Sequence, residues 1–296
     1  MTQITANNIE IEYDTFGDPS GRPLLMIMGL GAQMTRWREE LCQMLADEGH
    51  YVIRFDNRDI GLSQKFGHFG VPNIMRVFAD SQAGKPVHAP YTLGDMAEDA
   101  EGLLNALHID KAHVCGASMG GMIAQMMAVH HRERVLSLTS IMSTTGDPNL
   151  PKSTEEASAA LTSPPGKDLD EVVERAVAVA RAIGGKGFPI EAEAIKQRAR
   201  ADYERSFYPD GVSRQMAAIA ATGNRRHQLE HLDLPTLVIH GSDDPLVPVE
   251  GGVDTHEAIK GSRLKVIDGM GHDLPEAAWP EIVEAITEHT TANHHD

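Results

Sequence analysis

The chain has 296 residues, of which 41% are hydrophobic and 23% charged, a composition typical of a soluble globular protein. Its formal net charge of −17 repels phosphate backbones and anionic lipids, which argues against nucleic-acid and membrane partners. Two cysteines are too few for a disulfide framework, and no run approaches the ~18 apolar residues of a membrane span. The N-terminus shows no signal peptide, so we expect a cytoplasmic protein.

The first part of the chain alternates predicted strands with a predicted helix. Residues 9–13 alternate apolar and polar side chains, as a half-exposed antiparallel strand does. The mainly apolar runs 24–28 and 51–55 favour buried strands. Between these two strands, residues 34–48 carry apolar side chains at helical spacing.

A long excursion over 64–91, with one apolar helical patch, follows the third predicted strand. Such loops over strand ends are often functional. Thr92 is a predicted N-cap, with Asp95 three residues later in place of the usual capping-box Glu. Further strands are predicted at 112–115 and 135–142, with helices between. This alternation predicts a doubly wound, mostly parallel α/β sheet.

The pattern changes from residue 144 to about residue 231, where no strand-like run occurs. We therefore predict a core domain of residues 1–143 and 232–296, and an inserted all-helical cap of residues 144–231. Strands resume in the core at 236–240 and 264–267, before a last helix. The helices expected in the cap cover 153–162, 168–183, 190–206 and 212–222.

One pentapeptide, Gly116-Ala-Ser118-Met-Gly120, fits the G-x-S-x-G nucleophile elbow. A predicted strand precedes it and a helix follows, which is the context that the motif requires. A sharp turn of this kind brings backbones together, so a Cβ at either glycine would collide. Five residues also match by chance, and a Gly-rich turn with an incidental serine is the alternative.

A nucleophilic serine needs a base, and the base needs an orienting acid. In a sheet of this class the chemistry gathers past the carboxyl ends of the strands. Asp244 follows the strand 236–240, and His272 follows the strand at 264–267, in the order Ser, Asp, His. Asp243 competes with Asp244, but adjacent side chains at a strand end point in opposite directions.

Three motifs in this order, the elbow, Gly241-x-x-Asp244-x-x-x-Pro248 and Gly271-His272, resemble those of the α/β-hydrolase family. The resemblance covers nearly the whole chain except the helical insertion, which lies where that family has its cap. It implies a triad of Ser118, His272 and Asp244. Met-Gly at 28–29, Arg-Asp at 58–59 and the residues around His272 are similar to the aclacinomycin methylesterase branch, which hydrolyses a methyl ester on a bulky aromatic polyketide.

Acyl transfer also needs hydrogen-bond donors for the tetrahedral oxyanion. We expect the backbone amides of Met119 and Leu30 to supply them. Relatives usually carry His-Gly-x where this chain has Met28-Gly29-Leu30, so a polar anchor for the loop is missing. Arg58 is expected to be structural, and Asp59 stands where the family has glycine.

These residues predict a serine carboxylesterase that acts on small to medium apolar esters. Substrate contacts are expected from Met28, Gly29 and Met142, with methionine suited to adaptable ligand surfaces. The histidine pairs have no metal-ligand pattern, so neither a metal nor a cofactor is expected. A small-molecule ester is the expected partner, and a homodimer is left open. Lactonase, carbon–carbon bond hydrolase and perhydrolase remain alternatives, with a slowly hydrolysing ligand receptor less favoured.

Overall fold

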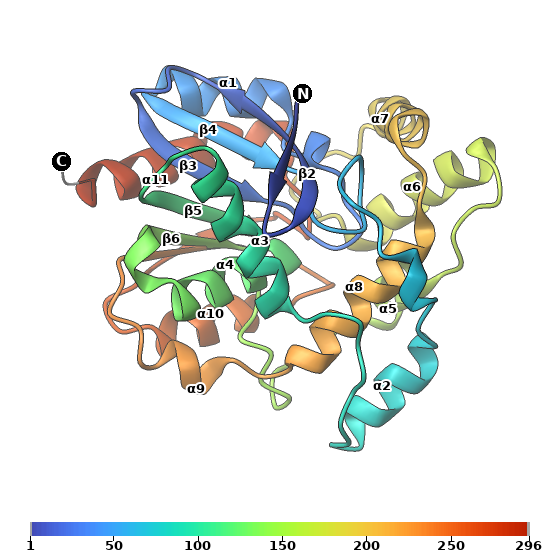
Figure 1. The fold of residues 1–296 in the computed structure, drawn as a ribbon. Coiled ribbons are helices and arrows are strands. Elements are labelled where there is room, and N and C mark those ends of the chain that lie inside the picture. Colours follow the sequence, from blue (N-terminus) through green and yellow to red (C-terminus); the bar gives the residue numbers. More distant parts are fainter. Residues whose placement is uncertain (1, 295–296) are drawn as a thin grey trace.

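Eight strands form one sheet in the order β1-β2-β4-β3-β5-β6-β7-β8 in a computed structural model that describes residues 2–294 (Figure 1). The pairs β1–β2 and β2–β4 are antiparallel, and the other neighbours are parallel. The strands are β1 (Thr2–Ala6), β2 (Ile9–Phe16), β3 (Arg22–Ile27), β4 (His50–Phe55), β5 (Ala112–Ala117), β6 (Val135–Ile141), β7 (Thr236–Gly241) and β8 (Arg263–Ile267).

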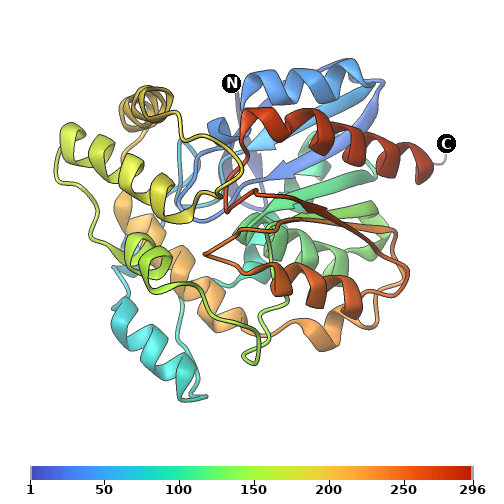
Figure 2. The same ribbon diagram turned by 180° about the vertical axis from the view of Figure 1, so that it is seen from behind.

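Helices cover both faces of this sheet. α1 (Glu39–Asp47) and α11 (Trp279–Ala292) pack on one face, as Figure 1 and Figure 2 show. The other face is covered by α3 (Leu93–Ala106), α4 (Met119–His130) and α10 (Val249–Ala258). Both faces of the central strands are therefore buried, which explains why their sequences are mainly apolar, with a few buried polar residues in β5 and β6. The predicted doubly wound, mostly parallel sheet is confirmed.

Between β6 and β7 the chain forms helices and loops but no strand within the described residues. We call four of these helices the cap: α5 (Glu155–Thr162), α6 (Leu169–Ile183), α7 (Ala192–Arg205) and α8 (Pro209–Thr222). The short helix α9 (Arg226–Leu229) contacts α4 and α10 of the core. The exact domain boundaries at residues 144 and 231 stay a prediction.

The excursion at 64–91 contains α2 (Ile74–Gln82), which packs against α8 of the cap. The predicted capping box at the start of α3 is present, since the Thr92 and Asp95 side chains each accept a hydrogen bond from the other residue's backbone amide. The two side chains thus satisfy two backbone amides that the first helical turn leaves free.

Two details differ from the sequence-based expectation. β1 was not predicted, because this edge strand buries little beyond Ala6 and so lacks an apolar pattern. The helix expected over 34–48 is interrupted: a 3-10 turn at Met34–Arg36 is followed by extended residues before α1 begins. One of these extended residues, Trp37, is fully buried, and packing its ring into the core overrides local helix propensity.

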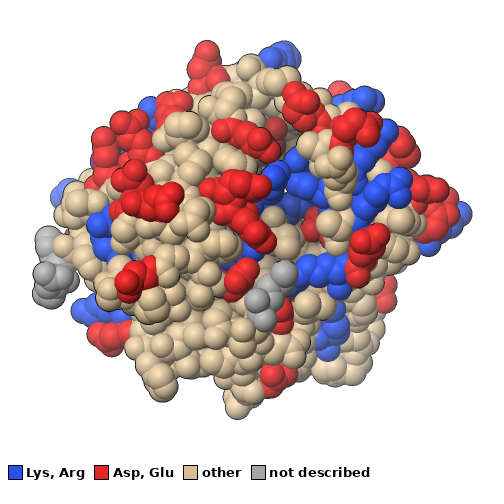
Figure 3. All heavy atoms as spheres, turned by 90° about the horizontal axis from the view of Figure 1, so that it is seen from above, with Lys and Arg blue, Asp and Glu red and all other residues tan. Residues whose placement is uncertain are grey.

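Charged side chains are unevenly spread over the surface. Figure 3 shows acidic residues over much of the face seen from above, with Lys and Arg gathered beside a hollow on the α7 side. Two ion pairs join α7 to the core: Arg36–Asp202 at 3.0 Å and Arg205–Asp56 at 2.7 Å. Among residues 2–294, no helix combines the length and the apolar character needed to cross a membrane.

Candidate active site

Ser118 lies in the turn between β5 and α4, with φ 55° and ψ −121°. An L-residue rarely adopts this conformation, so the neighbouring structure must hold it in place. The glycines explain how the turn closes. A Cβ at Gly116 would lie 2.1 Å from the Gly120 carbonyl oxygen, and one at Gly120 would lie 2.0 Å from that of Ile27. Either substitution would force backbone apart, which is the collision expected of this motif.

Three segments that are distant in the sequence meet at Ser118. Its Oγ is 2.8 Å from Nε2 of His272, and Nδ1 of His272 is 2.8 Å from Oδ2 of Asp244. A carboxylate only accepts hydrogen bonds, so Nδ1 carries a proton and Nε2 presents its lone pair to the serine hydroxyl. The arrangement allows Ser118 to give up its proton to His272.

The Asp244 carboxylate is held on both oxygens. Oδ1 accepts the backbone amides of Leu246 and Val247 at 2.9 and 2.8 Å, while Oδ2 faces His272. Burial opposes ionisation, yet the charge of His272 and hydrogen bonds from His240, His272 and the Val247 amide keep the pKa of Asp244 at about 2. Asp244 is therefore ionised at neutral pH. Asp243 faces elsewhere and accepts the Lys186 amide at 3.3 Å.

The sequence reasoning missed His240, the residue before the Gly241 motif. Its Nε2 is 2.8 Å from the Val247 carbonyl and 3.5 Å from Oδ2 of Asp244, and its side chain is fully buried. Because a carbonyl can only accept, Nε2 carries the proton and is the atom nearest the carboxylate. His240 thus braces the turn that carries Asp244. A histidine at the end of a buried strand gives no sequence signal of such contacts.

The two amides expected to bind the oxyanion flank the serine. Gly29, one residue before Leu30, is so close that a Cβ on it would lie 3.1 Å from Cβ of Ser118. Met119 is the first residue of α4, where backbone amides are unpaired and the helix dipole is positive. Among the described residues, the amides of Leu30 and Met119 donate to no protein acceptor.

The two methionines expected to contact substrate are buried. Met28 and Met142 are 7% and 4% exposed and belong to the apolar cluster between the sheet and the helices α1 and α11. Met28 leads into Gly29, and the Met142 amide donates to Ile239 at 2.8 Å at the end of β6. Both therefore lie on chain segments next to those that carry Gly29 and Ser118, and a Cβ on Gly29 would contact Ser118 directly.

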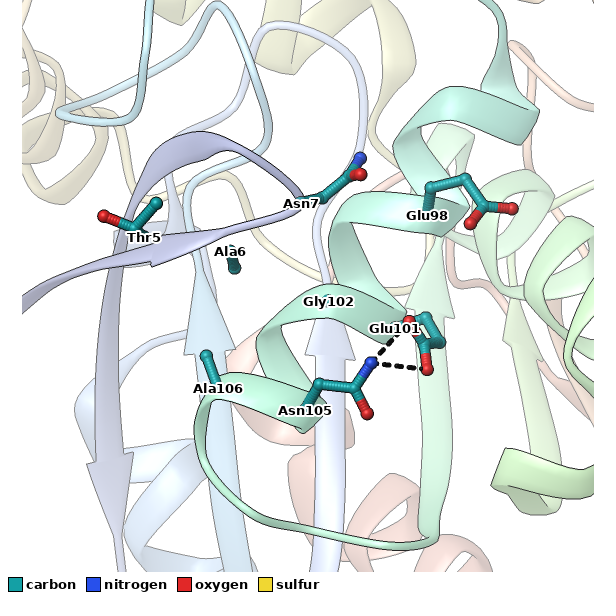
Figure 4. Close-up of a pocket in the computed structure, with 8 residues that line it drawn as sticks. All are labelled: Thr5, Ala6, Asn7, Glu98, Glu101, Gly102, Asn105 and Ala106. Carbon is teal, nitrogen blue, oxygen red and sulfur yellow. Dashed lines mark hydrogen bonds between the residues drawn. The ribbon is translucent and has the colours of Figure 1, made fainter.

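Two hollows lie outside this hydrogen-bond network. A cavity of about 230 Å³ adjoins the elbow, since one of its walls is Met122, whose amide donates to the Ser118 carbonyl at 3.2 Å. Its other walls include Phe78 of α2 and Ile219 of α8. The second hollow, of about 440 Å³, lies between Asn7 and α3 (Figure 4), and no residue of the triad lines either hollow.

The loop after β4 ties the site to the cap. Arg58 makes a bidentate ion pair with Asp99 of α3, at 2.6 and 2.7 Å, so its predicted structural role is confirmed. Asp59, with φ 71°, pairs with Arg214 of α8 at 2.8 and 2.9 Å. The Tyr91 hydroxyl also donates to Asp59, at 2.7 Å. Asp59 therefore links the core, the excursion and the cap.

No set of three or more His, Cys, Asp or Glu side chains among residues 2–294 is grouped to hold a metal ion. The side chains and amides around Ser118 offer a hydroxyl next to a base, an ionised acid behind the base, and two unpaired amides beside the hydroxyl.

Comparison with known proteins gives one family. The α/β hydrolase fold model matches residues 22–276. The chain is similar to the rhodomycin D methylesterases DauP of Streptomyces sp. (strain C5) and DnrP of Streptomyces peucetius, at 29% and 28% identity, each over 98% of this chain and 97% of the relative. Among solved structures, a thermophilic esterase from Thermogutta terrifontis is 27% identical with a TM-score of 0.70, covering 99% of both chains.

Proposed function

Because the chain belongs to the α/β-hydrolase fold family, we propose that it is a serine-dependent carboxylic ester hydrolase that forms an acyl-enzyme. One observation carries the proposal: an unbroken hydrogen-bond chain runs from Ser118 through His272 to Asp244, with 2.8 Å at each step. Such a chain activates a hydroxyl that is otherwise a weak nucleophile. Likeness to two rhodomycin D methylesterases supports an ester as the bond that is cleaved.

In the first half of the reaction, Ser118 Oγ attacks the ester carbonyl carbon while its proton moves to Nε2 of His272. The carbonyl oxygen becomes an oxyanion, which accepts hydrogen bonds from the Leu30 and Met119 amides. Asp244 stays ionised and stabilises the imidazolium. His272 then gives the proton to the leaving alcohol, and the acyl group stays on Ser118.

In the second half, His272 removes a proton from a water molecule that attacks the acyl-serine ester. The same two amides hold the second oxyanion. Collapse of this intermediate returns the proton to Ser118 and releases the carboxylic acid. Each step uses a side chain or amide of this chain, and each proton that His272 takes up is passed on.

The substrate proposed is an ester with a small to medium apolar group. The cavity beside the elbow, about 230 Å³, is below the roughly 300–1,000 Å³ of pockets that bind drug-sized ligands. Phe78, Met122 and Ile219 give it apolar walls. Gly29 leaves room beside Ser118, while Met28 and Met142 shape the site from beneath.

Replacing Ser118 with alanine tests the mechanism directly. The Ser118→Ala protein should keep its fold, because the substitution removes one partly buried hydroxyl and leaves the backbone unchanged. We expect hydrolysis of p-nitrophenyl esters to fall by at least about 10⁴-fold. Turnover close to that of the wild type, with circular dichroism unchanged, would overturn the assignment of Ser118.

A substrate panel tests the ester specificity. With p-nitrophenyl esters of increasing acyl length, kcat/KM should rise to a short or medium chain and then fall. A profile that ignored chain length would contradict the proposed pocket. Faster turnover of lactones than of open-chain esters would indicate a lactonase instead, and one slow turnover followed by a long-lived acyl-serine would indicate a ligand receptor.

A further inference from the structure

The turn Gly29–Ala32 carries the Leu30 amide, and hydrogen bonds hold it at three places. Asn57 Nδ2 donates to the Met28 carbonyl at 2.8 Å, on the peptide before Gly29. The Gly31 amide donates to Oε1 of Gln215 at 2.9 Å, on the peptide after Leu30. Within the turn, the Ala32 amide donates to the Gly29 carbonyl at 3.3 Å.

These three contacts fix the direction of the Leu30 amide. The Gly29 carbonyl and the Leu30 N–H belong to one planar trans peptide, so they point in opposite directions. The Ala32 amide holds that carbonyl on the inner side of the turn, which leaves the Leu30 N–H facing out. Side-chain amides clamp the peptide on either side. Rotation of the Leu30 peptide would therefore break contacts at both ends.

Gln215 comes from the cap, 184 residues away in the sequence from Gly31. It lies on α8 with its side chain fully buried, and its Nε2 donates to the Arg58 carbonyl at 3.0 Å. Both ends of its amide group are therefore used. One helical turn earlier on α8, the Val212 side chain packs against Gly31, and a Cβ on Gly31 would lie 3.1 Å from Cγ2 of Val212. Gly31 has φ 67°, which favours glycine as well.

We propose that Gln215 is a positioning residue for the oxyanion: it aims the Leu30 amide, so a cap helix completes a site otherwise built from the core. The inference rests on the proposed esterase function. It also explains how the chain manages with Met28 in place of a polar anchor, because Asn57 from the core and Gln215 from the cap hold the loop instead.

The test compares Gln215→Met with a matched control, Gln33→Met. Gln33 is also buried and also joins this loop region to the cap, through the carbonyls of Asp202 and Ser206 at 2.6 and 3.0 Å. Its side chain holds no peptide between Met28 and Gly31. For Gln215→Met, we expect kcat for a p-nitrophenyl ester to fall about 10- to 100-fold, a part of the effect of deleting an oxyanion donor. KM should change less than about threefold.

The second readout is affinity for an alkyl boronic acid, which forms a tetrahedral adduct on serine with an oxygen in the oxyanion site. Its dissociation constant should rise in step with the loss of kcat in Gln215→Met and stay within about threefold of wild type in Gln33→Met. If Gln215→Met does not fold, Gln215→Leu takes its place, because leucine also lacks an acceptor for the Gly31 amide. It should show the same fall in kcat, with boronate affinity following kcat.

Equal kcat and equal boronate affinity in the wild type and the folded Gln215 variants would overturn the inference. So would losses in Gln33→Met as large as those in Gln215→Met, because Gln215 would then serve only to seat the cap. A wild-type protein that neither hydrolyses esters nor binds the boronate overturns the proposed function, and the inference with it. An active wild type with unaffected Gln215 variants overturns the inference alone.

Discussion

The elbow around Ser118 and the junction between α8 and the core are both buried, but different forces hold them. At the elbow, backbone lies against backbone, and one added carbon at Gly116 or Gly120 would meet a carbonyl oxygen within 2.1 Å. At the junction, the charges of Asp59 and Arg214 are joined with both side chains at 0% exposure. The elbow is held by close backbone packing that leaves no room for an added atom. The junction is held by two opposite charges that must both be present.

The two regions are therefore destabilised by different kinds of substitution. Close backbone packing fails when an atom is added, and a buried ion pair fails when one partner is removed. The triad combines the two features. It stands on the packed elbow, but its acid is a buried carboxylate that needs its own partners, as Asp59 does.

The largest effect is expected from a change that alters charge at the triad and leaves the packing untouched. Asp244→Asn should lower kcat by about 10⁴-fold, because an amide cannot hold His272 in the required tautomer or stabilise its charged form. Asp243→Asn, on the adjacent residue, should stay within about twofold of wild type. Steady-state kinetics on one ester would decide, and equal losses in both variants would contradict the assignment of Asp244.

A smaller effect is expected at the junction. Arg214→Met leaves the Asp59 carboxylate buried without its cation, which should cost about 3–5 kcal/mol of unfolding free energy. Adding Asp59→Asn removes the orphaned charge, so the double variant should recover part of that loss. Urea unfolding of the wild type, both single variants and the double variant measures the coupling. Additive effects would mean that the ion pair contributes nothing as a pair.

The smallest effect per residue is expected from three buried histidines, which have no anionic partner among residues 2–294. Burial lowers the pKa of His50 and His289 to about 4 and that of His113 to about 3, against an ordinary 6.5. Below pH 6.5 the unfolded chain binds protons at these sites that the folded chain does not. The unfolding free energy therefore decreases as the pH is lowered from 6.5 to about 3–4.

Between pH 7 and pH 5 this should remove on the order of 2 kcal/mol for each histidine. Unfolding free energies measured across that range would show the slope. His113→Asn keeps a donor or acceptor near the Ser137 hydroxyl, which the imidazole Nδ1 contacts at 2.8 Å, but it cannot titrate. Its stability should therefore depend less on pH than that of the wild type. A slope unchanged by this substitution would count against the role of His113.

The same contrast explains what the sequence could predict. The sheet and the cap helices follow from local apolar periodicity, and the residues 118, 244 and 272 each follow a strand in a short motif. Local rules of this kind can be read from neighbouring residues. The edge strand β1 lacked such a signal, because it buries so little.

The side chains that link distant parts of the chain could not be predicted. Gln215 reaches Gly31 across 184 residues, and its position on α8 looks like any polar position on a helix. No sequence pattern indicates the contacts of Arg214 or His240 either. Their contacts depend on how whole helices and strands pack, which no local pattern specifies. The missing polar residue at Met28 did point to a gap in the loop's anchoring, but not to what fills it.

The backbone of Ser118 has a consequence for selection. A residue other than glycine held at φ 55° and ψ −121° costs on the order of 1–3 kcal/mol. Glycine adopts such angles readily, so Ser118→Gly should fold more stably than the wild type while losing its nucleophile. Selection for stability alone would remove this serine. If Ser118 is the nucleophile, as proposed, its presence marks a position where activity has been favoured over stability.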